Sequence, residues 1–268
     1  MKRLVMVAGL SLLLPLLSAA DTTEAPNPLP SACAPLKAFC GAEGFGADSV
    51  GGRGGTVLHV TNPNDSGPGS LREALTATGP RIVVFDTGGT INLLSEIEIH
   101  NPFLTVAGQT APGGGIAIKA DASYDKSALA IETHDVVMQG MRIRPDATAA
   151  IAENRRSLEI NTGPGNNVAY NVIVDHSSIS WGQDDNLTVG DGAHDVTISW
   201  SFITEALSQA NHPEGEHSRG LNISIKNYEA TGPLTQKVSV HHNLLAHNVA
   251  RNPEIDAEDT VDLVNNVI

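Results

Sequence analysis

Apolar residues in the second half of the chain follow one template that recurs along the sequence. Five segments begin with two apolar residues separated by one position and carry a further apolar residue seven places after the first; they start at Val136, Val172, Val196, Val238 and Val261. These starts are 36, 24, 42 and 23 residues apart, so the longer intervals carry insertions. Alternation predicts short half-buried strands, and the repeat predicts stacked coils that bury their apolar faces against one another.

Helical patterning is scarce outside one segment. Ser70 and Glu73 have the spacing of a capping box and predict a short helix over residues 70–75. The sequence therefore predicts an all-β fold, a right-handed parallel β-helix of roughly eight coils, with this helix covering the open strand edges at its N-terminal end. A β-sandwich is the alternative, but it needs hairpin turns every eight to twelve residues or so, and the intervals here are longer.

The N-terminus has the pattern of a secretory signal. Lys2 and Arg3 precede an apolar run over 4–17 and three small residues that end at Ala20. This predicts a signal peptide over 1–20, a disordered leader over 21–32 and a β-helix domain over 33–268. The apolar run is too short to span a membrane, so we expect a secreted, extracellular monomer. The chain stops in the middle of a repeat, which predicts a domain that is incomplete at its C-terminus.

Charge and cysteine usage narrow the possible partners. The net charge of −14 argues against nucleic-acid binding, although a divalent cation can bridge an acidic protein to an anionic polymer. Cys33 and Cys40 are the two cysteines of the chain. In an exported protein they either pair as a disulfide that ties down the start of the domain, or remain free thiols.

Polar and charged residues gather around one of the predicted strands. The segment over residues 172–185 alternates apolar positions with an acid, an imidazole and hydroxyl groups, and ends with Trp181, Asp184 and Asp185. Such groups beside a buried strand are costly unless a site uses them. The sequence therefore predicts a functional site at this coil.

Six motifs, which run in order over nearly all of the chain after residue 37, resemble those of secreted pectate lyases of polysaccharide lyase family 1. They cover residues 38–55, 65–75, 84–91, 106–116, 174–189 and 241–253. The resemblance implies a parallel β-helix and an enzyme that cleaves α-1,4-polygalacturonate, an anionic plant cell-wall polysaccharide, by β-elimination. It also implies calcium as cofactor, since this ion stabilises the charge that develops on the uronate carboxylate.

The resemblance places the calcium ligands on two adjacent coils. Asp184 matches an aspartate that binds calcium in the family, whereas the acid expected four residues later falls on Thr188. On the preceding coil Arg156 or Ser157 stands where another acid is expected, and Glu159 follows shortly after. The predicted metal set is therefore Asp184, Asp185 and Glu159, a site poorer in carboxylates than is usual, at which the metal arrives mainly with the substrate or binds weakly.

The same resemblance gives the catalytic and substrate-binding candidates. Arg251 matches the arginine that removes the C5 proton, a role that requires a strong perturbation because a free guanidinium stays protonated. His217 and Arg219 lie near the family's substrate-binding lysine, and an arginine there pairs with a uronate carboxylate in a fork. Trp181 stacks on a sugar ring or packs in the core. A further family arginine is expected near Asp256 and is absent there, which is a second departure from the family pattern.

Two other functions are compatible with the sequence. A β-helical glycoside hydrolase uses a pair of acids, but adjacent residues such as Asp184 and Asp185 face opposite ways on an extended chain. A non-catalytic, polysaccharide-binding β-helix is favoured by Thr188 and by the acid that is absent from the preceding coil. Sequons for glycosylation occur at Asn64, Asn186 and Asn222.

Overall fold

The structure is a computed structural model that describes residues 36–217, 219–224, 234–256 and 260–268. The predicted signal peptide and leader, and Cys33 with them, lie outside the described residues. Cys40 is disulfide-bonded, and its pairing with Cys33 stays a prediction. Among the described residues, no helix is long and apolar enough to cross a membrane.

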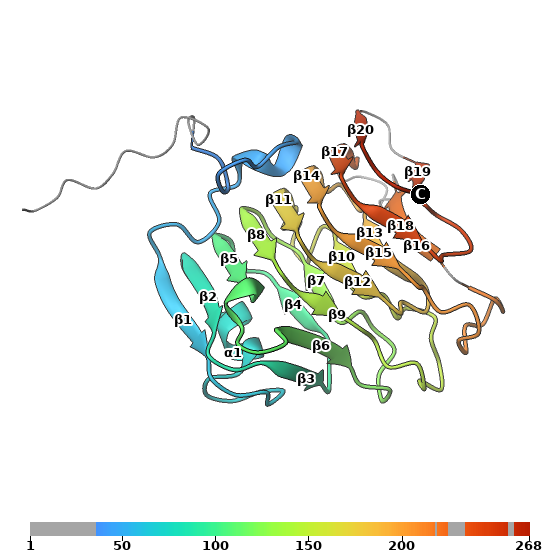
Figure 1. Cartoon of the computed structure of the whole chain (residues 1–268), viewed down its shortest axis with the longest axis horizontal. Helices are drawn as coiled ribbons and strands as arrows, with labels where there is room; N and C mark the ends of the chain where they lie inside the picture. The colour runs from blue at the N-terminus through green and yellow to red at the C-terminus, as the bar shows by residue number, and fades with distance from the viewer. Residues whose placement is uncertain (1–35, 218, 225–233, 257–259) are drawn as a thin grey trace, which may run out of the picture.

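Three parallel sheets wind around one core (Figure 1). Sheet A contains β1 (Thr56–Val60), β2 (Arg81–Phe85), β5 (Leu104–Ala107), β8 (Val136–Gln139), β11 (Tyr170–Asp175), β14 (His194–Ser199), β17 (Gln236–His241) and β20 (Val261–Val264). Sheet B contains β3 (Gly89–Leu93), β6 (Ile116–Ala120), β9 (Arg142–Ile143), β12 (Ser178–Ser180), β15 (Phe202–Thr204) and β18 (Leu244–Ala246). Sheet C contains β4 (Ile97–Ile99), β7 (Leu129–Ile131), β10 (Leu158–Ile160), β13 (Asp185–Val189), β16 (Arg219–Ser224) and β19 (Glu254–Asp256).

The repeat seen in the sequence is the register of the coils. The five valines that start its copies pair in sheet A in the order Val136, Val172, Val196, Val238 and Val261. The apolar residues seven places later pair in sheet B, as Ile143, Ile179, Ile203 and Leu245. All described strand pairings are parallel, so the predicted parallel β-helix is confirmed and the β-sandwich is excluded.

The core runs through the inside of the coils. Each sheet contributes fully buried apolar side chains, for example Val174 from β11, Ile179 from β12 and Leu187 from β13. Because side chains alternate along a strand, the residues between them face outward and are available for a site. The short strands therefore present rows of outward side chains that are stacked from coil to coil.

The capping helix is confirmed as α1 (Leu71–Thr76), which lies beside β1 and β4 at the N-terminal end of the coils. Ser70 is its N-cap and accepts a hydrogen bond from the Glu73 amide. The Glu73 carboxylate accepts in return from the amide of Gly69 (2.7 Å), one residue before the expected partner. Leu71 and Leu75 join the core cluster, so α1 covers apolar side chains of the first coil.

The corner between sheets A and B is a tight turn that repeats in register. His176, Trp200 and His242 occupy it on successive coils, each with a positive φ between 47° and 57°. Their rings stack: Trp200 and His242 lie 4.3 Å apart between centroids, and His176 and Trp200 lie 6.1 Å apart. Ring stacking offsets part of the strain of left-handed backbone at non-glycine residues.

Of the three glycosylation sequons, the one at Asn186 is inaccessible, because Asn186 is fully buried in the folded chain.

Candidate active site

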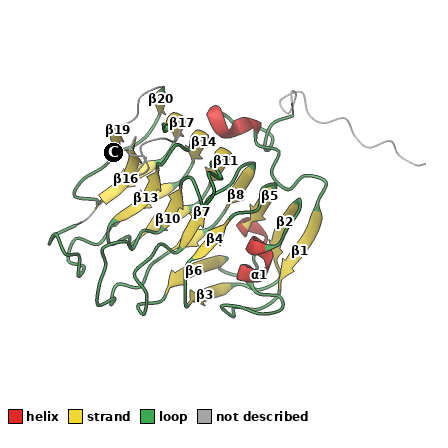
Figure 2. Cartoon of the chain, turned by 180° about the vertical axis from the view of Figure 1, so that it is seen from behind, coloured by secondary structure: helices red, strands yellow, loops and turns green. Residues whose placement is uncertain are grey.

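A cleft of about 410 Å³ opens over sheet C, where β13, β16 and β19 lie side by side (Figure 2). Five of the predicted site residues line it: Asp184, Asp185, His217, Arg219 and Arg251. The structure thus brings together residues that are up to 67 positions apart. In register, Asp185 of β13 pairs with Arg219 of β16, and the next coil adds Arg251 just after the bridge between Arg219 and Ala250.

Two adjacent arginines, Arg155 and Arg156, lie just before β10 and connect its coil to the next one. Arg155 is fully buried and donates to backbone carbonyls, including those of Ala120 and Asp121, while its Nε donates to the Gln183 side chain (2.7 Å). The Gln183 amide donates to the Arg155 carbonyl in return. This double link fixes the two coils to each other, so that the next residues, Arg156 and Asp184, meet in the cleft.

Arg156 lies among all three predicted calcium ligands. Its guanidinium pairs with Asp184, contacts Glu159 at 2.9 Å and approaches Asp185 at 3.7 Å. Burial by itself lowers the pKa of Arg156, but Glu159, Asp184 and Asp185 outweigh it and raise the pKa. A permanently charged guanidinium therefore stands where the prediction expects a metal ion.

Arg251 is fixed by carboxylates on both sides. Its Nη1 lies 2.9 Å from both oxygens of Asp185, and its Nε lies 2.5 Å from Glu254. Thr188, at the position where an acid was expected, donates its hydroxyl to Asp185 (3.2 Å). Asp185 is thus the anchor that holds the predicted catalytic arginine over the cleft.

Burial first and the neighbouring Asp184 second raise the pKa of Asp185 to about 6, against the opposing effect of Arg251 and Arg156. Only 1% of the Asp185 side chain is exposed, so its charge depends on these two arginines. Above a pH of about 6 the carboxylate is ionised and pairs with Arg251.

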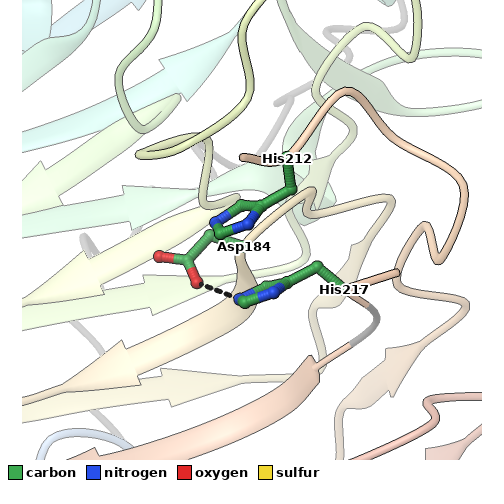
Figure 3. A group of neighbouring side chains, drawn as sticks. All are labelled: Asp184, His212 and His217. Carbon is green, nitrogen blue, oxygen red and sulfur yellow. Dashed lines mark hydrogen bonds and ion pairs between the residues drawn. The ribbon is translucent and has the colours of Figure 1, made fainter. Parts of the chain in front are cut away.

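His217 is a partner of Asp184 inside the cleft wall. Its Nε2 donates to Asp184 Oδ1 (3.0 Å), and its ring stacks on His212 with 3.5 Å between centroids (Figure 3). Burial lowers the pKa of His217, and the neighbouring Arg219 and His212 lower it further, against the opposing effect of Asp184. Only 2% of the His217 side chain is exposed, so the role that its contacts support is to orient Asp184.

Asp184, His212 and His217 form a group of metal-ligating type, with one ligand atom from each lying within 4.8 Å of the others. Calcium prefers a shell of about six to eight oxygens, whereas two imidazoles and one carboxylate suit a transition metal. An imidazole nitrogen binds a metal in the plane of its ring. Two rings stacked at an interplanar angle of 15° cannot both direct a lone pair at one ion, so this geometry does not fit a chelate.

The predicted set of Asp184, Asp185 and Glu159 does not fit a resident calcium either. Glu159 accepts from Ser127, Arg156 and Asn161, and the two aspartates are paired as described above. Every one of these carboxylates already has a cation or a donor at both oxygens. A calcium ion would have to displace Arg156.

The structure separates two predicted residues from the cleft. Glu159 does not line it but reaches it through Arg156. Trp181 lines a different hollow beside Glu205 and His247, and Arg144 lies over its ring at 5.7 Å. Conversely, His212 and Glu254 were not predicted. Glu254 pairs with Arg251 only three residues before it, and His212 stacks on His217 within one loop, but neither residue lies in a motif that marks the site in the sequence.

The fold and the site define a parallel β-helix protein whose outer sheet face carries a cleft of arginines and carboxylates. Sequence similarity makes the relation closer: the chain is 36% identical to "Probable pectate lyase C" of Neosartorya fischeri over 87% of its own length, and 35% identical to the protein of that name from Emericella nidulans over 90%. The chain is therefore similar to these probable pectate lyases over most of its own length. It spans about half the length of these relatives, 48% and 49%.

Solved structures with a related chain path include pectate lyase II from Xanthomonas campestris, with a TM-score of 0.49 at 16% identity over 82% of this chain and 66% of that one. The major cedar pollen allergen jun a 1 gives a TM-score of 0.45 at 15% identity over 77% of this chain and 62% of that one. No family model matches the chain.

Proposed function

We propose that the protein is a secreted, monomeric lyase that cleaves α-1,4-polygalacturonate by β-elimination. The observation that carries this proposal is the convergence of Arg156, Arg219 and Arg251 on one cleft, in a chain similar to probable pectate lyases. A uronan carries a carboxylate on every sugar, and guanidinium groups bind carboxylates with charge-assisted hydrogen bonds. The N-terminal signal pattern supports export.

The reaction needs a base on one side of the sugar and positive charge at its carboxylate. A base takes the C5 proton, the C4–O bond breaks, a double bond forms between C4 and C5, and the departing oxygen takes up a proton. We assign proton removal to Arg251. As it lies, Arg251 is paired with Asp185 and Glu254, so the substrate carboxylate has to draw it from one of these partners.

Arg219 is the residue best placed to meet the substrate carboxylate. Its nearest acids, Asp184 at 3.6 Å and the exposed Glu214 at 3.4 Å, are both longer contacts than those of Arg251. A substrate carboxylate can therefore take over these contacts at little cost. Charge on that carboxylate grows as the C5 proton leaves, so a fixed guanidinium beside it stabilises the transition state more than the ground state.

Calcium enters this proposal as an ion that comes with the substrate. The cleft is lined by three arginines but by six acids, of which four are exposed at its rim: Glu153, Glu214, Glu254 and Asp256. An anionic polymer meets net negative charge there, and a divalent cation between the rim and the polymer would neutralise it. This role leaves Arg156 in place.

The test follows the ultraviolet absorbance of the unsaturated product during incubation with polygalacturonate, with calcium and with a chelator. We expect an absorbance rise that Arg251→Ala abolishes and that Arg53→Gln, an exposed arginine remote from the cleft, leaves unchanged. New reducing ends without absorbance would show a hydrolase. Neither signal, from protein with an intact circular dichroism spectrum, would leave a polysaccharide-binding protein.

A further inference from the structure

We propose that the outer face of sheet B holds a second binding site for acidic polysaccharide, separate from the cleft on sheet C. Two adjoining hollows, of about 490 and 350 Å³, share Arg142, Gly114 and Gly115 in their linings. We call them together the sheet B groove. The proposal takes its ligand class from the proposed function, but it concerns binding of the polymer rather than its cleavage.

Aromatic rings are exposed along this groove. Trp200 and Phe202 each keep 53% of their surface exposed, and both line the larger hollow together with His176. Phe202 stands on the outward row of sheet B between Ser178 and Leu244. Exposed aromatic rings on a rigid sheet offer apolar faces that suit the apolar face of a sugar ring. The ring ladder at the corner accounts for Trp200 structurally, but it does not involve Phe202.

Two arginines in the groove have no counter-ion among the described residues. Arg142 donates from Nε to the Ile116 carbonyl (3.2 Å), and neither of its terminal nitrogens has an acceptor in the described part of the chain. Arg144 donates to Ser178 and to the Ile143 carbonyl, and it lines the smaller hollow together with Arg142. The exposed fork of Arg142 is left to bind a carboxylate.

The lining of the groove contrasts with the charge of the protein. Neither of its two hollows is lined by an acidic side chain, although the chain has a net charge of −14. Glu205, which lies beside Trp181, is an acid that acts on Arg144 from outside the groove. Two guanidinium groups that have no ion pair among the described residues, beside exposed rings, fit a polymer that is both a saccharide and an anion.

A glycine-rich loop keeps the groove open. In the run Pro112–Gly115, a Cβ added at Gly113 or Gly114 meets no atom within 4 Å, so a side chain there would project into free space. Gly114, unlike Gly113, has no left-handed φ. A large side chain at Gly114 therefore blocks the groove without straining the backbone.

The test measures retardation in affinity gels that contain polygalacturonate, with a chelator present so that the acidic cleft cannot use calcium. The variants are Arg142→Gln and Gly114→Leu. The matched control is Arg53→Gln, since Arg53 is also an exposed arginine with one described bond to a carbonyl, from Nη2 to Lys37. We expect Arg142→Gln and Gly114→Leu each to weaken polymer binding about five-fold, and the control to match the unmodified chain.

Four outcomes separate this proposal from the lyase. Weaker binding of both groove variants supports the groove, even if no ultraviolet product appears and the lyase proposal fails. Equal retardation of all variants overturns the groove, even if cleavage is observed. If gels that contain neutral dextran retard the unmodified chain as strongly as polygalacturonate gels do, the proposal that the ligand is acidic is overturned. A lower melting temperature of Arg142→Gln than of Arg53→Gln, without a binding change in Gly114→Leu, assigns Arg142 a structural role and also overturns the proposal.

Discussion

The cleft on sheet C and the groove on sheet B use the same residue type in opposite ways. In the cleft, Arg156 and Arg251 are half-buried and paired with carboxylates, whereas Arg142 in the groove is exposed and has no ion pair with a described residue. Both faces belong to the same stacked coils, and outward rows differ from sheet to sheet only in their side chains. Paired arginines provide fixed geometry for chemistry, while unpaired ones provide attraction for an anion.

Among the variants that test this difference between the cleft and the groove, the removal of Arg156 should have the largest effect. Arg156→Gln leaves Asp184, Asp185 and Glu159 without their shared cation, and breaking such a buried pair costs about 3 kcal/mol or more. We expect a lower melting temperature, which calcium raises in Arg156→Gln but not in the unmodified chain, because the freed oxygens can then bind the metal. A melting temperature that responds to calcium before substitution would show that Arg156 does not exclude the ion.

Asp185→Asn should displace Arg251 from its position in the cleft, although the new side chain has nearly the same size as the old one. The amide no longer holds Arg251 by charge, and misplacement of a catalytic group costs about a hundred-fold in rate. We expect kcat/KM for polygalacturonate to fall by about that factor, with KM little changed. The comparison is Thr188→Val, which removes one hydrogen bond to Asp185 and should lower the rate several-fold at most. Equal effects of the two variants would contradict the anchor role.

Activity and stability should change in opposite directions as pH rises. Because burial first and Asp184 second raise the pKa of Asp185 to about 6, the folded state binds a proton more tightly than the unfolded chain does. Between the usual aspartate pKa and 6, the contribution of Asp185 to the free energy of unfolding therefore falls as pH rises. Activity should rise through the same window, since ionised Asp185 holds Arg251. In Asp185→Asn both trends should flatten, as followed by melting temperature and initial rates.

The smallest effect should be that of salt on the groove. Exposed charges are screened at moderate ionic strength, whereas buried pairs are screened much less. The difference in polymer binding between Arg142→Gln and the unmodified chain should therefore shrink as sodium chloride is added. The melting temperature, which reflects the pairs around Arg156, should change less. A binding difference that is unaffected by salt would point to shape rather than charge.

Much of the fold could be predicted because its information is local. The spacing between Val172 and Ile179 places one residue in sheet A and the other in sheet B, and the same spacing recurs on other coils. The capping box at Ser70 is equally local. The coil that carries Asp184 and Asp185 could be located for the same reason, since polar residues beside an alternating strand are visible in the sequence.

The partners within the site could not be predicted. Arg156 and Asp184 are 28 residues apart, and Asp185 and Arg251 are 66 apart; their contacts exist only because coils stack in register. Trp181 lies only a few residues before Asp184 in the sequence, and yet it lies outside the cleft that Asp184 lines. A change of direction of the chain between them decides this, and residue types do not reveal it.

The sequence alone determined the repeat, the capping helix and the coil of the site, because hydrophobic burial imposes a period that is readable along the chain. Only the tertiary structure decided which arginines are neutralised and which are left to bind. Pairing depends on distances of a few ångströms between side chains on different coils, and electrostatic energy varies too steeply with separation and burial to be read from spacing in the sequence.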